Sequence, residues 1–196
     1  LSLVGSEMCI RDRLGDIVWD SPELFAGVRQ QVASLGIPVY GVIGNHDHDR
    51  NKYTDREATE NYRNHFGPTY YAFDMGRTHY IVLDDIVYHG AKKYDEQIDS
   101  LQLAWAAEYA RRLPAGSRVC VAMHAPAMKA WKGNQVMESA ARLMDAFAEG
   151  LGDYDKTHKV LILTTQVTYE GSDVGIYEVG KRVKNRFRFL EAHDMT

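Results

Sequence analysis

The chain is poor in cysteine and has no long apolar run. Its 196 residues include two cysteines, Cys9 and Cys120, and the second lies in a short apolar stretch. Two cysteines so placed exclude a disulfide framework and leave the redox compartment open. No segment approaches the ~20 consecutive apolar residues that a membrane-spanning helix needs. With 45% hydrophobic residues, the composition is typical of a soluble globular protein.

The chain also lacks an excess of basic charge and a glycine-rich phosphate loop. Lys and Arg number 23 against 27 Asp and Glu, which gives a net charge of −4. This balance argues against nucleic acid or an anionic membrane surface as the main partner. Neither G-x-G-x-x-G nor G-x-x-x-x-G-K-[ST] occurs, so an unrelated doubly wound nucleotide-binding fold is disfavoured. The length, without internal repeats, indicates one domain and leaves the oligomeric state open.

Three short polar motifs stand out, and the second and third follow short apolar stretches. They are Gly15-Asp16, Gly44-Asn45-His46-Asp47 and Met123-His124-Ala125-Pro126. An ionised Asp side chain can bridge two divalent cations. An Asn amide oxygen and a neutral imidazole complete a site for Zn, Mn or Fe rather than Mg or Ca. We therefore predict that Asp16, Asn45 and His124 bind metal.

The second motif also offers a candidate acid. An imidazole beside the metals, held by a carboxylate that fixes its tautomer, can protonate a leaving alkoxide. We predict His46 and Asp47 as that catalytic pair. Taken singly the motifs have simpler interpretations, because Gly-Asp is common in turns and His124 alone is compatible with a buried core histidine. The three motifs together favour a functional site.

With these motifs the chain resembles the calcineurin-like metallophosphoesterase superfamily, in particular its bacterial members. The similar segments are Gly-Asp-Ile-Val, Gly-Asn-His-Asp and Phe-Gly-Pro-Thr-Tyr-Tyr, and the resemblance runs from about residue 14 to 163. It implies an α/β fold, the αββα sandwich of mixed sheets flanked by helices. It also implies metal-dependent hydrolysis of phosphomonoesters or phosphodiesters. By resemblance Asp16 bridges two metals, Asn45 and His124 bind the second, and His46 acts on the leaving group.

Two motifs of that family are missing. No Asp-x-His precedes Leu14, and after the apolar stretch 159–163 the chain reads Thr164-Thr165-Gln166-Val167-Thr168 where the family has Gly-His-x-His. Gln166 falls at the first His position and offers a weak amide oxygen, whereas Thr168 is a poor ligand at the second. One site thus keeps three ligands and the other only Asp16. We predict that the chain binds one divalent ion (Mn, Fe or Zn) or none, where the parent enzyme binds two.

The two ends of the chain do not share the resemblance. Residues 2–13 resemble a translated sequencing adapter and have neither a signal-peptide core nor a helical period. We therefore expect residues 1–13 to be foreign to the domain, with no packed strand before Leu14, and an export signal cannot be judged. The partial phosphoesterase domain spans 14–169. Residues 170–196 form a tail of uncertain origin, whose basic run 181–188 we expect to be solvated.

Apolar periodicity predicts an alternating order of helices and strands. Ser21 and Gly36 mark the ends of the first helix, and a strand over 37–43 leads into the second motif. The polar segment 50–66 is expected to pass over the site. The remaining predictions are a hairpin over 70–74 and 78–84, helices over 22–35, 96–113 and 135–151, and strands over 118–123 and 159–163.

Two classes of function remain open. The first is an incomplete and nearly inactive catalytic domain whose parent protein hydrolyses a phosphoester substrate. The alternative is a non-catalytic module of the same fold that binds phosphate or a protein partner in the cleft left by the missing ligands. The sequence before Leu14 and after Leu163 discriminates between them.

Overall fold

The computed structural model describes residues 15–36, 38–76, 78–114, 117–125, 142–143 and 145 in full, and the backbone alone of 159–164 and 187–191. The expectations for residues 1–13, for Gln166 and for most of the tail 170–196 lie outside this set. So does most of the helix predicted over 135–151, of which Arg142, Leu143 and Asp145 are helical. Within the described residues, no helix is long and apolar enough to cross a membrane.

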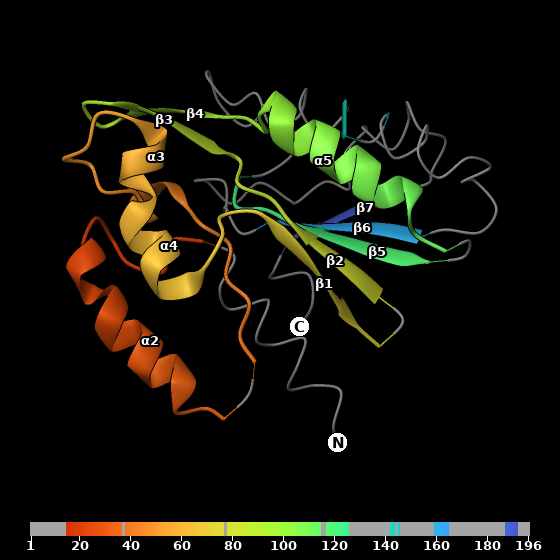
Figure 1. Cartoon of the computed structure of the whole chain (residues 1–196), viewed down its shortest axis with the longest axis horizontal. Coiled ribbons are helices and arrows are strands. Elements are labelled where there is room, and N and C mark those ends of the chain that lie inside the picture. The colour runs from red at the N-terminus through yellow and green to blue at the C-terminus, as the bar shows by residue number, and fades with distance from the viewer. Residues whose placement is uncertain are drawn as a thin grey trace.

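A five-stranded mixed sheet forms the centre of the molecule (Figure 1). Its strands, in spatial order, are β1 (Tyr71–Met75), β2 (Thr78–Val82), β5 (Arg118–Ala122), β6 (Lys159–Thr164) and β7 (Phe187–Glu191). β1 and β2 form an antiparallel hairpin, and each later pair is parallel. The hairpin and the strands predicted over 118–123 and 159–163 are confirmed. β7 was not predicted, because the tail shows no clear strand pattern.

Helix α5 (Ser100–Arg111) covers one face of this sheet (Figure 1). A buried cluster joins the two: Leu103 and Ala106 of the helix pack against Ile81 of β2, Val121 of β5 and Met123 just after β5. The alternation of strand residues and the helical period of the apolar positions make these two surfaces match. The mixed α/β class predicted from the sequence is therefore confirmed.

The helix predicted from residue 96 begins four residues later, because a second hairpin precedes it. β3 (Ile86–Gly90) and β4 (Lys93–Glu96) form a two-stranded antiparallel sheet that the sequence did not predict. Asp99 then caps the helix, since its carboxylate accepts hydrogen bonds from the backbone N–H groups of Leu101 and Gln102.

An extended segment, and not a strand, crosses the other face of the large sheet. Val42 packs there in a buried cluster with Val82 and Cys120, and Tyr40 stacks on Phe73 with 3.6 Å between ring centroids. The prediction of a strand over 37–43 is wrong for the described residues 38–43, where only Val42 forms an isolated bridge. The side chains of this segment pack on the face of the sheet, and its backbone is not one of the five hydrogen-bonded strands.

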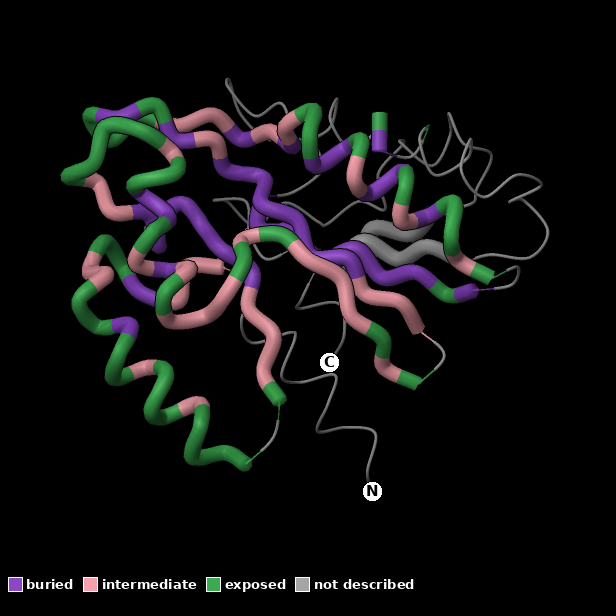
Figure 2. Tube along the Cα trace, viewed as in Figure 1, coloured by how far each residue is buried: buried purple, intermediate pink, exposed green. Residues whose placement is uncertain are grey.

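Three helices lie beside the sheet and support the two N-terminal motifs (Figure 1). The predicted first helix is present as a 3₁₀ turn (Pro22–Leu24) followed by α2 (Phe25–Ala33), and the 50–66 segment contains α3 (Asp55–Ala58) and α4 (Glu60–Phe66). Phe25 and Tyr62 pack edge to face in a buried cluster with Val18 and Ile43. Figure 2 shows that burial follows the central strands and this junction, whereas α2 exposes most of its length.

Candidate metal centre

The first motif lies in a loop with unusual backbone angles. Gly15 has a φ of +104°, and Asp16 and Asp20 have φ of +51° and +55°. Asp tolerates this left-handed region better than most residues, because its short side chain makes local hydrogen bonds. The Asp16 Oδ1 atom accepts a hydrogen bond from the His46 backbone N–H at 3.0 Å. The loop is thereby fixed against the second motif.

Asp47 connects these two loops through their backbones. Its fully buried carboxylate accepts hydrogen bonds from the N–H groups of Val18 at 3.0 Å and Gly44 at 2.9 Å. Burial raises the pKa of Asp47 to about 7. The sequence predicted that this carboxylate holds His46, but the structure directs both of its oxygens to backbone groups. Consecutive side chains of the short 3₁₀ turn Asn45–Asp47 diverge by about 120°, which separates Asp47 from its neighbour's ring.

The three predicted metal ligands converge. The Nε2 atom of His124 lies 3.0 Å from Oδ1 of Asn45 and 3.5 Å from Oδ1 of Asp16. Two ligands that bind one ion at ~2.0–2.2 Å are themselves about 3.0–3.5 Å apart in octahedral or tetrahedral geometry. Asn45 and His124 are buried, at 5% and 2% exposure. The spacing and the mixed N and O donors therefore fit one divalent ion.

Two glycines leave the space in which these side chains meet. A Cβ atom on Gly15 would collide with the imidazole of His124, and one on Gly44 would collide with the backbone N and the carboxylate of Asp16. Glycine at both positions allows the loops to approach the imidazole closely.

His124 itself is held by Asp85, a residue that directly follows Asp84 after β2. The buried Asp85 carboxylate accepts hydrogen bonds from the N–H groups of His124 at 3.1 Å and Ala125 at 2.8 Å. Burial raises the pKa of Asp85 to about 8. Because β2 and β5 are parallel neighbours, the residues after both strands meet at one edge of the sheet.

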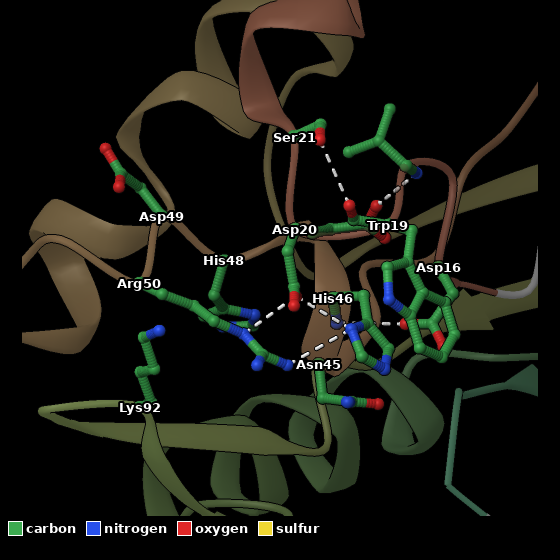
Figure 3. A network of polar contacts seen from close by, with 12 residues as sticks. Asp16, Trp19, Asp20, Ser21, Asn45, His46, His48, Asp49, Arg50 and Lys92 are labelled. Atoms are coloured by element: carbon green, nitrogen blue, oxygen red, sulfur yellow. Dashed lines mark hydrogen bonds and ion pairs between the residues drawn. The ribbon is translucent and has the colours of Figure 1, made fainter.

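The imidazole of His46 lies in a separate polar network beside these donors (Figure 3). Its Nδ1 atom is 2.7 Å from Oδ1 of Asp20, which also pairs with Nε of Arg50 at 2.7 Å. Arg50 Nη2 lies 3.1 Å from the same Nδ1. We assign the Nδ1 proton to the shorter contact, with His46 donating to Asp20, because one nitrogen cannot both donate to Asp20 and accept from Arg50. This tautomer leaves Nε2 for another partner.

Sequence reasoning did not single out Asp20, Arg50, Trp19 or Asp85. One signal for Asp20 is a second Asp four residues after the first in the same loop. One for Asp85 is the pair of carboxylates, Asp84 and Asp85, that follows an apolar stretch. Trp19 stacks on His46, with ring centroids 3.6 Å apart and planes at 19°. Only the folded loops bring these side chains to the motif residues.

A second ion near Asp16 would need ligands besides these three donors. Gln166 lies outside them, and within them no group of three or more His, Cys, Asp or Glu side chains is placed to hold a metal. The converging set reaches three donors only because Asn45 supplies an amide oxygen.

Comparison with known proteins identifies the family of the chain. The model of the calcineurin-like phosphoesterase family matches residues 14–154, which include all three motifs. No curated protein and no solved structure matches the chain. Members of the matched family hydrolyse phosphoesters and typically depend on divalent metals. With most of its length matched, the chain belongs to the calcineurin-like phosphoesterase family.

Proposed function

We propose that this chain carries a phosphoester-hydrolysing centre in which Asp16, Asn45 and His124 hold one divalent ion, Mn, Fe or Zn. The convergence of their donor atoms, within 3.5 Å of the His124 Nε2 atom, carries the proposal. The substrate is a phosphomonoester or a phosphodiester. When bound, a divalent ion polarises phosphoryl oxygens and lowers the pKa of a bound water.

The remaining residues serve proton transfer and orientation. When both ring nitrogens of His46 carry protons, Nε2–H donates its proton to the leaving oxygen, while Asp20 accepts from Nδ1–H and fixes the ring. Arg50 balances the charge of Asp20 through their 2.7 Å pair. Asp47 acts on catalysis indirectly, because it holds the first two motifs together and does not contact the ring of His46.

Metal binding by the chain tests the proposed ligands. We expect calorimetry with Mn or Zn to give one site. His124→Ala should weaken it at least tenfold, because loss of a residue that merely orients a metal ligand already costs about 10- to 100-fold. His89→Ala is the matched control, since His89 is half exposed and pairs with Asp95 in the β3–β4 hairpin. Equal loss in both variants would refute the assignment.

Turnover tests whether one ion suffices. We expect the chain to hydrolyse aryl phosphates very slowly, because two-metal catalysis requires both cations. A variant with Thr165→Gly, Gln166→His and Thr168→His, and with an Asp-x-His strand in place of residues 1–13, is expected to regain metal-dependent activity. His46→Ala in that variant should abolish it. Equal, His46-dependent turnover by the original chain would contradict the one-ion assignment, whereas phosphate binding without turnover by the restored variant would favour a binding module.

A further inference from the structure

Trp19 presents an indole to solvent at the edge of the candidate site. The residue is 72% exposed, and the other side of its ring lies against the His46 imidazole, with centroids 3.6 Å apart. Single exposed apolar side chains are ordinary on protein surfaces. Trp19 differs from Leu24 or Leu101, which are also exposed, because its ring plane is fixed against a residue of the site (Figure 3).

The backbone around Trp19 explains this orientation. The left-handed residues Asp16 and Asp20 bracket the loop, and the Asp20 N–H donates to the His46 carbonyl at 3.1 Å. The Ser21 hydroxyl donates to the carbonyl of Trp19 at 3.1 Å. The loop thus turns the Asp20 carboxylate toward His46 while the indole covers one face of the imidazole. The opposite face of the indole is available to a ligand.

We propose that the outer face of Trp19 stacks on the base of a nucleoside phosphate whose phosphoryl group occupies the metal centre. This inference rests on the proposed function, since it names the substrate class of the same site. A flat π-system is the natural partner of a fixed indole face. A ring on that face lies two ring spacings from His46, so an aryl group bonded directly to the leaving oxygen does not reach it. A pentose between phosphate and base supplies the required spacer.

Binding of two matched ligands tests the platform without requiring turnover. AMP and ribose 5-phosphate share the phosphate and the sugar, and differ in the base. We expect the Mn-loaded chain to bind AMP more tightly in calorimetry. Trp19→Ala should weaken AMP by roughly 5- to 150-fold, the range for loss of one base–aromatic stack. The same variant should leave ribose 5-phosphate unchanged, and Trp19→Phe should retain most of the AMP affinity.

Leu101→Ala is the control, because Leu101 is 75% exposed on helix α5 and belongs to neither the metal donors nor the His46 network. It should change neither affinity. Equal binding of AMP and ribose 5-phosphate by the unaltered chain, or equal weakening of both by Trp19→Ala, would overturn the platform and leave Trp19 as a cover for His46. Inorganic phosphate separates this failure from failure of the proposed function. If inorganic phosphate binds only in the presence of metal and AMP binds no more tightly than ribose 5-phosphate, the role of Trp19 is refuted and the metal centre stands. If AMP binds more tightly than ribose 5-phosphate but neither affinity depends on metal, the proposed metal centre is refuted instead.

Discussion

Replacing Asp85 with alanine is expected to destabilise the fold far more than an equivalent change at a helix cap. The Asp85 carboxylate is fully buried and is the acceptor for the N–H groups of His124 and Ala125. A buried N–H without an acceptor costs about 1–3 kcal/mol, so losing both acceptors costs about 2–6 kcal/mol. Such a loss is a large fraction of the ~5–15 kcal/mol that stabilises a typical domain.

Asp99→Ala is the matched control, because Asp99 also accepts from two backbone N–H groups, those of Leu101 and Gln102, but does so near the surface. Water replaces a lost cap there, and the expected cost is about 0.5–2 kcal/mol. Urea unfolding of both variants measures the difference, and Asp85→Asn, which keeps one acceptor oxygen, should lie between them. A loss in Asp85→Ala no greater than that in Asp99→Ala would refute the assigned role of burial.

Two further outcomes follow from the same residues. Burial raises the pKa of Asp47 to about 7 and that of Asp85 to about 8, from 3.8, so the folded chain binds more protons than the unfolded chain between roughly pH 4 and pH 8. The free energy of unfolding should therefore fall as pH rises through that window, and urea curves showing greater stability at pH 8 than at pH 5 would contradict this.

Gly44→Ala should weaken Mn binding, because a Cβ there collides with Asp16. The backbone itself would tolerate alanine, since the Gly44 φ of −115° suits any residue. Gly76→Ala, with open space but a φ of +60°, should cost about 1–2 kcal/mol of stability and leave Mn affinity unchanged; an equal loss of affinity in both variants would exclude the collision as the cause.

The regular elements could be predicted where hydrophobic periodicity alone decides them. Strand β5 is apolar after its first residue, Arg118, and the β1–β2 hairpin brackets a glycine turn at Gly76. The predicted start of α5 was too early. Ile98 fits the helical period of apolar residues, but it lies before Asp99, which caps the helix that begins at Ser100. The segment 38–43 has the composition of a strand, yet it packs over the sheet face and forms only an isolated bridge at Val42.

The sequence was enough to predict the metal donors of the site but not the residues that orient them and His46. Asp16, Asn45 and His124 each stand in a short motif, so their residue types and order suffice to nominate them. The partner of His46 depends on backbone angles instead. Adjacency in the chain suggested Asp47, but the left-handed conformation at Asp20 turns that more distant carboxylate toward the ring. No local pattern records such a turn.

The separation of 79 positions between Asn45 and His124 determines when their contact forms during folding. Loop-closure entropy grows with sequence separation, and contacts between distant segments form after local ones such as the β1–β2 hairpin. The two donors meet only when parallel β5 has joined β2 and carried His124 to the second motif. An ion at this position binds chains whose sheet has already closed, so it slows their unfolding and does not nucleate their collapse.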